Sequence, residues 1–160
     1  MTVQLQAWGA GDLPLLRALL GDPAMMEHLG GPESPEKIAE RQERYLAEPG
    51  ALKIVVDGVG AGWVGYWERE WQGEQIYEIG WSVVPGFQGR GVASEATRLA
   101  LDATRASDGP RSVHAFPPPG NHASNAICRK AGFEFLGEVE FEYPKGSFSP
   151  CNDWVYDLSR

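Results

Sequence analysis

The chain has 160 residues, of which 42% are hydrophobic, and it carries a formal net charge of −8 at pH 7. This hydrophobic content, together with six tryptophans, excludes a disordered chain. The length is that of one domain spanning residues 1–160, and it is sufficient to bury a core. The acidic balance argues against a general affinity for nucleic acid.

Membrane, disulfide and metal classes also find no support in the sequence. No apolar run approaches the roughly 18 residues that cross a bilayer, and the N-terminus lacks the basic-then-apolar pattern of a signal peptide. The two cysteines, Cys128 and Cys151, do not suggest a disulfide framework. His28, His114 and His122 have no metal-ligand spacing. We therefore expect a reduced, cytoplasmic protein with no membrane partner, no nucleic-acid partner and no metal.

The first half of the chain predicts a strand, two helices and a hairpin. Ser34-Pro35 is a strong helix start, since a capping side chain precedes a proline at the first helical position. Asp57-Gly58 is a turn between two β-rich runs. The predicted elements are a strand over 2–8, helices over 13–20 and 34–47, and strands over 52–56 and 61–70.

The second half alternates strands and helices. Pro85-Gly86 stops a β-branched and aromatic strand, and Gly132 suits a left-handed helix cap. The predicted elements are strands over 74–84, 111–116, 133–143 and 153–158 and helices over 93–106 and 124–131. These elements together indicate a mixed α/β fold around one sheet.

The stretch from Glu78 to Glu95 is the most informative in the chain. It predicts a strand, a short turn and a loop that opens directly into a helix; the loop is Gln88-Gly89-Arg90-Gly91-Val92-Ala93. Gly89 and Gly91 have no Cβ atom, so a ligand can approach the backbone closely. Free N–H groups at a helix N-terminus bind phosphate oxygens, and Arg90 adds a positive charge.

Other glycine-rich motifs fit this loop less well. It is not a P-loop, because no Gly-Lys-Ser/Thr follows the glycines. It is not a dinucleotide-binding fingerprint, because position 94 is Ser94 rather than glycine or alanine. From these residues alone, a tight strand-to-helix turn without a ligand stays open.

The loop also fits Q/R-x-x-G-x-G/A, the acetyl-CoA pyrophosphate signature of the GNAT superfamily of N-acetyltransferases, with Gln88, Gly91 and Ala93 at its defined positions. Residues 22–32 resemble the opening of the branch that acetylates ribosomal-protein N-termini. Residues 121–133 are similar to the N-x-x-S…K-x-G-F helix of that branch. The three motifs come in the family's order, and the resemblance covers about residues 3–158.

The resemblance implies a fold and a cofactor-binding site. The fold would be a mostly antiparallel twisted sheet of about six or seven strands with about four helices. Acetyl-CoA would be the co-substrate, and the N–H of Val83 or Trp81 would stabilise the oxyanion. The residues expected to contact the cofactor are Ser82, Val83, Val84, Gln88, Gly89, Arg90, Gly91, Val92, Ala93, Ser94, Asn121, Asn125 and Arg129. A plain turn or capping role for Asn121 stays open.

Two carboxylates compete as the base that accepts the ammonium proton. Glu78 lies on the strand before the loop, close to where several family members place their base. Glu142 belongs to a strand in which Glu138, Glu140 and Glu142 alternate onto one face, which is also the pattern of a solvated face. A carboxylate base would need a raised pKa. We favour Glu78.

The acid that protonates the leaving thiolate is less defined. Many family members have a tyrosine four residues before the Gly-Phe of the last helix, where this chain has Cys128. The ribosomal-protein branch instead implies Ser124. A buried cysteine is more often inert packing, so we rank Ser124 above Cys128, and both below a mechanism without an acid.

The sequence thus predicts a single-domain N-acetyltransferase that uses direct transfer from acetyl-CoA to a primary amine. A protein or peptide N-terminus is the expected acceptor. A small molecule such as an amino acid, polyamine or antibiotic is the alternative, and a non-catalytic acyl-CoA-binding module is a second one. Relatives also suggest a possible homodimer.

Overall fold

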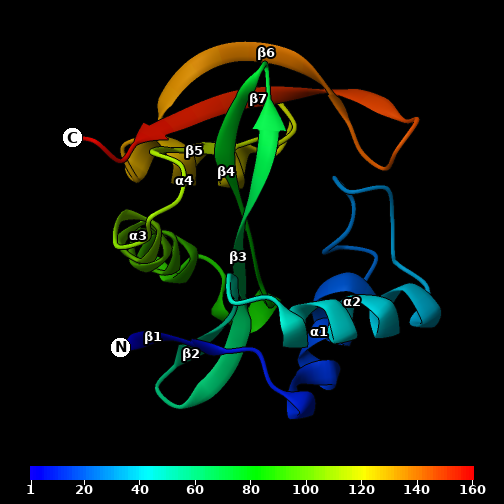
Figure 1. Cartoon of the computed structure of the whole chain (residues 1–160). Helices are drawn as coiled ribbons and strands as arrows, with labels where there is room; N and C mark the ends of the chain where they lie inside the picture. The colour runs from blue at the N-terminus through cyan, green and yellow to red at the C-terminus, as the bar shows by residue number, and fades with distance from the viewer. The chain divides into compact units, whose positions relative to one another are not determined.

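A computed structural model describes all 160 residues, which form one seven-stranded sheet and four α-helices (Figure 1). The strand order is β1-β2-β3-β4-β5-β7-β6. The strands are β1 (Val3–Ala7), β2 (Ala51–Val56), β3 (Val59–Trp71), β4 (Glu74–Val83), β5 (Ser112–Ala115), β6 (Glu134–Glu142) and β7 (Phe148–Asp157). The helices are α1 (Leu13–Leu20), α2 (Pro35–Ala47), α3 (Val92–Arg105) and α4 (His122–Lys130). The predicted mixed α/β fold is confirmed.

Two features of the secondary structure differ from the sequence prediction. Short 3₁₀ turns occupy Ala10–Asp12 and Pro85–Phe87. Strand β7 begins at Phe148, ahead of the predicted start at residue 153, because its first residues pair with β6 through Phe141↔Ser149 and Glu140↔Pro150. These residues have little alternation of their own, so the partner strand decides their conformation.

The chain divides into two compact units, which we call unit 1 and unit 2. Unit 1 comprises Met1–Gly65 and Trp81–Ala100, and unit 2 comprises Tyr66–Gly80 and Leu101–Arg160. Strands β3 and β4 and helix α3 each have residues in both units.

Unit 1 joins the β1–β2–β3 ladder to helices α1 and α2. All pairs in this ladder are antiparallel, with a bulge between Ile54 and Val55. The Ser34 side chain caps α2 by accepting from the Lys37 N–H at 3.2 Å, as predicted. The helices pack on an apolar cluster that consists of Trp8, Leu16, Ile38, Tyr45 and Ala51.

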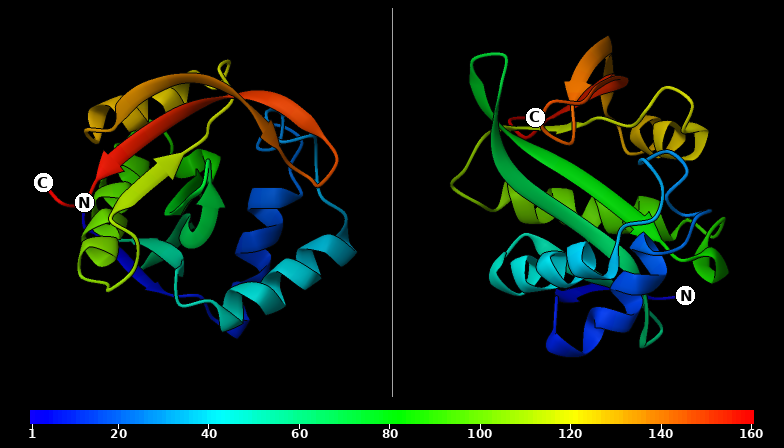
Figure 2. Two further views of the ribbon diagram at one scale, coloured as in Figure 1. Left: turned by 45° about the horizontal axis from the view of Figure 1, so that its top comes forward. Right: turned by 90° about the vertical axis from the view of Figure 1, so that its right-hand side faces the viewer.

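Unit 2 contains the β5–β7–β6 ladder, visible as a long curved ribbon in Figures 1 and 2. Strand β5 pairs in parallel with β4 through Tyr77↔Val113 and Glu78↔His114, and antiparallel with β7. Helix α4 ends where Gly132 takes φ +94°, and the Phe133 N–H donates to the Cys128 carbonyl at 3.0 Å. This is the Schellman cap that a left-handed glycine permits.

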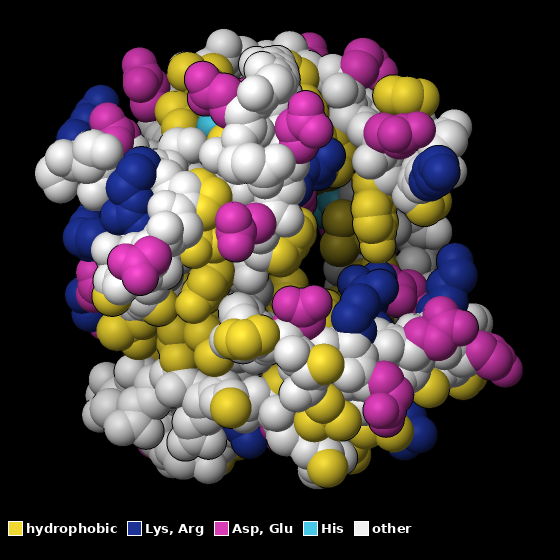
Figure 3. Space-filling model, viewed as in Figure 1, with side chains coloured by type: hydrophobic (Ala, Val, Ile, Leu, Met, Phe, Trp, Pro, Cys, Tyr) yellow, Lys and Arg dark blue, Asp and Glu magenta, His cyan; other side chains and the backbone are white.

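No helix combines the length and apolar character that crossing a bilayer requires. On the face drawn in Figure 3, acidic and basic side chains are interspersed with apolar ones. The net charge is therefore not gathered into a single acidic patch on that face.

Candidate active site

The glycine loop of unit 1 joins β4 to α3. After the 3₁₀ turn, Gly89 and Gly91 take φ +73° and +77°, and α3 begins at Val92. An L-residue adopts this left-handed region only with strain, so the two glycines are conformational requirements of the turn. A Cβ built on either glycine would meet nothing within 4 Å, so the loop surface beside them is open.

The loop presents backbone donors at the start of α3. The first bond of the helix runs from the Glu95 N–H to the Gly91 carbonyl, at 3.1 Å. The N–H groups of Val92, Ala93 and Ser94 therefore have no acceptor within the helix. Gly91 has no side chain that could cap them. Unpaired donors at the positive end of a 14-residue helix attract an anion such as a phosphate group.

Gln88 and Arg90 bond to the backbone of their own segment. The Gln88 amide donates to the Val83 carbonyl at 2.8 Å and to the Met25 sulfur at 3.4 Å. The Arg90 guanidinium donates to the Gly86 carbonyl at 3.3 Å and lies over the Phe87 ring. Gln88 thus fixes the end of β4, while the exposed Arg90 keeps its charge at the loop.

The end of β4 in unit 1 is held close to β3. The Val84 N–H donates to the Ala61 carbonyl at 2.9 Å. Because donors alternate along a strand, the Val83 and Trp81 N–H groups point to the opposite edge. Gly62 makes this approach possible, since a Cβ there would lie 2.2 Å from the Ser82 carbonyl oxygen. Sequence analysis missed Gly62, although a glycine inside a strand signals close backbone contact.

Glu78 lies in unit 2, in a buried polar environment. Its side chain is 15% exposed, and its Oε1 accepts from Arg69 Nη1 at 2.7 Å. Burial raises the pKa of Glu78 above the ordinary range, and the bonds from Arg69 and Trp67 and the charge of His114 only partly oppose that rise. A raised pKa is the property that a carboxylate base requires, and the sequence could not show it.

Glu142 has a different environment. Its side chain is exposed near the end of β6, and its Oε2 accepts from the Gly146 N–H at 2.9 Å in the β6–β7 connection. Glu138 and Glu140 are also exposed, as the solvated-face interpretation predicts. The structure thus gives Glu142 a turn-stabilising bond, whereas Glu78 has the buried setting.

The asparagines of α4 hold the fold around them. Asn121 caps α4, its side chain accepting from the Ser124 N–H at 3.1 Å. The Asn125 amide donates to the Pro118 and Asn121 carbonyls, and its oxygen accepts from Asn152 and Trp154. These four bonds use the full capacity of an amide, so a cofactor contact by Asn125 would require one of them to break.

The other predicted residues of α4 differ in exposure. Ser124 is half-buried in the first turn, and Arg129 is exposed with its guanidinium over the Trp154 ring. Cys128 is fully buried, and burial raises the pKa of its thiol to about 12. This setting is that of a packing cysteine rather than a proton donor.

Sequence analysis missed a buried pair next to Glu78. His114 Nδ1 lies 2.6 Å from Asp153 Oδ1, and the Trp71 indole donates to Asp153 Oδ2 at 3.3 Å. The two side chains come from β5 and β7, and neither has a local motif around it. Only their burial distinguishes these two residues from other histidines and aspartates, and burial cannot be read from the sequence.

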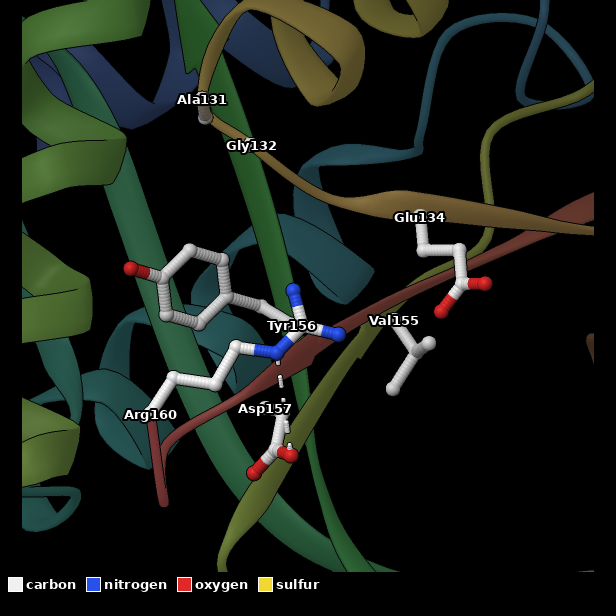
Figure 4. Close-up of a pocket in the computed structure, with 7 residues that line it drawn as sticks. All are labelled: Ala131, Gly132, Glu134, Val155, Tyr156, Asp157 and Arg160. Carbon is white, nitrogen blue, oxygen red and sulfur yellow. Dashed lines mark ion pairs between the residues drawn. The ribbon is translucent and has the colours of Figure 1, made fainter.

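A separate small pocket lies in unit 2 (Figure 4). Its volume is about 200 Å³, and it is lined by Ala131, Gly132, Glu134, Val155, Tyr156, Asp157 and Arg160. None of these residues belongs to the predicted site, so we do not assign the site to it. The structure also brings together no group of three or more histidine, cysteine or acidic residues that could hold a metal.

The sequence model of the acetyltransferase (GNAT) domain family matches residues 2–134. The chain belongs to the GNAT family. A relative from Bacillus subtilis (strain 168), an uncharacterized N-acetyltransferase named YnaD, is 33% identical over 82 residues. That match covers 51% of this chain and 45% of the relative, so it spans less than half of the relative's length.

Solved structures share the GNAT fold at low sequence identity. A GNAT acetyltransferase from Bacillus anthracis has a TM-score of 0.84 at 18% identity, covering 100% of this chain and 97% of the other. An acetyltransferase of Salmonella typhimurium that modifies the N-terminal serine of ribosomal protein L7/L12 has a TM-score of 0.77 at 21% identity. That match covers 98% of this chain and 95% of the other. The aminoglycoside acetyltransferase AAC(6')-Ib in complex with coenzyme A has a TM-score of 0.78 at 21% identity. That match covers 98% of this chain and 95% of the other.

Proposed function

We propose that this GNAT protein is an acetyl-CoA-dependent N-acetyltransferase in which a primary amine attacks the thioester directly in a ternary complex. The observation that carries the proposal is the loop of unit 1, where Gly89 and Gly91 turn the chain into α3, whose first N–H groups have no acceptor within the helix. That arrangement suits the pyrophosphate of coenzyme A.

The proposed cofactor-binding site combines backbone and side-chain groups. Residues 88–94 would bind the pyrophosphate, and the backbone of Ser82–Val84 would bind the pantetheine arm. The Val83 or Trp81 N–H would donate to the oxyanion, since both point away from β3. Asn121 and Arg129 remain proposed cofactor contacts, whereas Asn125 is already fully hydrogen-bonded.

The transfer requires one base. Glu78 takes a proton from the acceptor ammonium, directly or through one water molecule, and the free amine attacks the thioester carbonyl. The tetrahedral intermediate then loses the second proton of its nitrogen to solvent and expels the thiolate of coenzyme A, leaving a neutral amide. The buried thiol of Cys128 is poorly placed to protonate that thiolate, so Ser124 or solvent remains as donor.

The proposed acceptor is a protein or peptide N-terminus. Support comes from residues 22–32 and 121–133, which resemble the ribosomal-protein branch, and from the fold shared with the L7/L12-modifying enzyme. The shared fold of AAC(6')-Ib supports the alternative of a small-molecule amine. Cytoplasmic location and a homodimer stay predictions.

The first test is a thermal shift with acetyl-CoA, with adenosine and without ligand. At a ligand concentration of ~100 times Kd, binding adds about 2.7 kcal/mol and should raise Tm by several degrees. A rise in Tm with acetyl-CoA, and not with adenosine, supports the proposed cofactor-binding site. No rise at millimolar acetyl-CoA would contradict the proposed function.

The second test is release of free thiol over a panel of amines. We expect the highest kcat/KM for peptides with a free N-terminus. Preference for an aminoglycoside or polyamine would favour the small-molecule alternative. Binding of acetyl-CoA without turnover of any amine would favour the non-catalytic module.

A further inference from the structure

Unit 2 contains a buried histidine–aspartate pair that the proposed transfer does not use. His114 is 7% exposed and Asp153 is 3% exposed. Their side chains meet at 2.6 Å, and the Phe116 ring stacks on the imidazole with centroids 5.7 Å apart. Burying two ionisable groups this deeply costs folding free energy unless the groups are paired. Such buried pairs are often found at functional sites.

The geometry leaves one nitrogen of His114 available. The Asp153 carboxylate can only accept, so Nδ1 carries the proton in the 2.6 Å bond. Trp71 donates to the second carboxylate oxygen and thereby holds Asp153 in place. The other ring nitrogen, Nε2, bonds to no protein group, and in the neutral ring it has a free lone pair.

His114 is also a neighbour of the proposed base. Glu78 and His114 are register partners on the parallel strands β4 and β5, so their side chains lie on the same face of the sheet. The charge of His114 acts on Glu78, lowering the pKa of that carboxyl. The other ionisable groups around them are Arg69, which bonds to Glu78, and Cys151, whose thiol pKa is raised by burial and by the charges of Glu78 and Glu140.

A base in this position needs a route for its proton. Glu78 is largely buried, and Arg69 and Trp67 both donate to its carboxylate. After each transfer Glu78 carries a proton and must lose it before the next turnover. Slow loss would limit the rate, because both of these donors bond to the carboxyl group, whereas the unbonded His114 Nε2 is not sealed from solvent.

We propose that His114, oriented by Asp153, accepts this proton from Glu78 and returns it to solvent. The inference rests on the proposed acetyl transfer with Glu78 as base. In the step, the O–H bond of protonated Glu78 breaks and an N–H bond forms at His114 Nε2, directly or through one water. The imidazolium is balanced by the Asp153 carboxylate, and the regenerated Glu78 carboxylate pairs again with Arg69. No oxidant or co-reactant is needed.

If the His114–Asp153 pair were only structural, its role would be to stabilise the pairing of β5 with β7. The substitution His114→Asn separates the two roles, because the asparagine amide can still donate to Asp153 from near the Nδ1 position but cannot take up a proton. Asp153→Asn keeps an acceptor for His114 and removes the balancing charge. A matched surface control is Glu43→Gln, at an exposed position on α2.

The decisive experiment measures kcat and KM by thiol release as a function of pH, together with Tm. For His114→Asn we expect kcat to fall at least about tenfold, with KM for acetyl-CoA within twofold and Tm within a few degrees. Asp153→Asn should change kcat in the same direction, and Glu43→Gln should change neither constant. Retention of kcat within twofold by a folded His114→Asn protein would overturn the inference and leave the proposed function intact. If the wild type turns over no amine, it is the proposed function that fails.

A second measurement does not depend on turnover. NMR spectra of the imidazole nitrogens contain signals from three histidines, and His28 and His122 are exposed and can be assigned by substitution. We expect Glu78→Gln to shift the Nε2 signal of His114 at a fixed pH, because the substitution changes the group that the relay places opposite Nε2. An unchanged signal would mean that the two groups do not interact, and would overturn the relay.

Discussion

The glycine loop of unit 1 and the polar cluster of unit 2 build their chemistry from different parts of the chain. The loop offers backbone N–H groups from residues 88–94, consecutive in sequence, and its glycines serve only to shape and expose that backbone. The cluster offers side chains from β3, β4, β5 and β7, namely Arg69, Glu78, His114 and Asp153.

This difference decides how each region tolerates change. In the loop, the positive-φ glycines and the side chain of Gln88, which bonds to the Val83 carbonyl, are the restricted positions, and the remaining backbone donors do not depend on residue type. In the cluster each side chain depends on the others for its hydrogen bonds and its charge balance. A single substitution should therefore be felt more strongly in the cluster than in the loop.

The largest expected effect is that of Glu78→Gln. Glutamine keeps the size of the side chain and can still accept from Arg69, but it cannot take a proton. We expect kcat/KM in the thiol-release assay to fall about 100-fold. The control Glu43→Gln should be neutral, and a loss of less than tenfold for Glu78→Gln would refute the assignment of the base.

The loop is tested by Gly91→Ala against Gly86→Ala. Gly91 has φ +77°, so alanine there costs about 1–2 kcal/mol of stability and adds a methyl group where the cofactor would approach. We expect the Kd for acetyl-CoA, measured by calorimetry, to rise about tenfold, an estimate that assumes about 1.4 kcal/mol of lost contact.

Gly86 is a matched control for that substitution. It lies in the 3₁₀ turn just before the loop, it has no positive φ, and a Cβ there would meet nothing within 4 Å. Alanine at 86 should leave Kd within twofold. Equal effects of the two substitutions would show that the left-handed turn does not shape the binding site.

Stability should depend on pH through Glu78 in a defined direction. Because burial raises its pKa, the folded protein binds this proton more tightly than the unfolded chain does. The resulting stability is complete below the ordinary carboxyl range and is lost as pH rises through the raised pKa. Urea unfolding between about pH 4 and pH 8 should therefore show Glu78→Gln gaining stability relative to the wild type as pH rises. The opposite trend would indicate that Arg69 more than offsets burial.

The smallest expected effect is that of Glu142→Gln. The side chain is exposed and its one bond, to the Gly146 N–H, can be kept by glutamine. We expect kcat/KM to change less than twofold and the free energy of unfolding to change by less than about 1 kcal/mol. A fall in kcat/KM of tenfold or more would indicate that Glu142, rather than Glu78, is the base.

Local sequence signals predicted most of the fold. The Ser34 cap, the Asp57-Gly58 turn and the left-handed Gly132 each act through residues a few positions away, and the structure has all three. The early start of β7 was missed because residues 148–152 are strand only through pairing with β6. Gly62 was missed because its close contact is with Ser82, near the far end of the next strand, and no signal in the residues around Gly62 identifies that partner.

The sequence by itself determined the family, through its motifs, and the shape of the glycine loop, because helix caps, turns and glycine spacing are short-range properties of the backbone. Tertiary structure alone decided the electrostatics. Glu78 and Glu142 are the same residue type on two strands, and only burial separates a carboxyl with a raised pKa from an exposed turn acceptor. The His114–Asp153 pair likewise exists only because β5 and β7 are neighbours in the sheet, and proton affinity depends on such neighbours and on the loss of water.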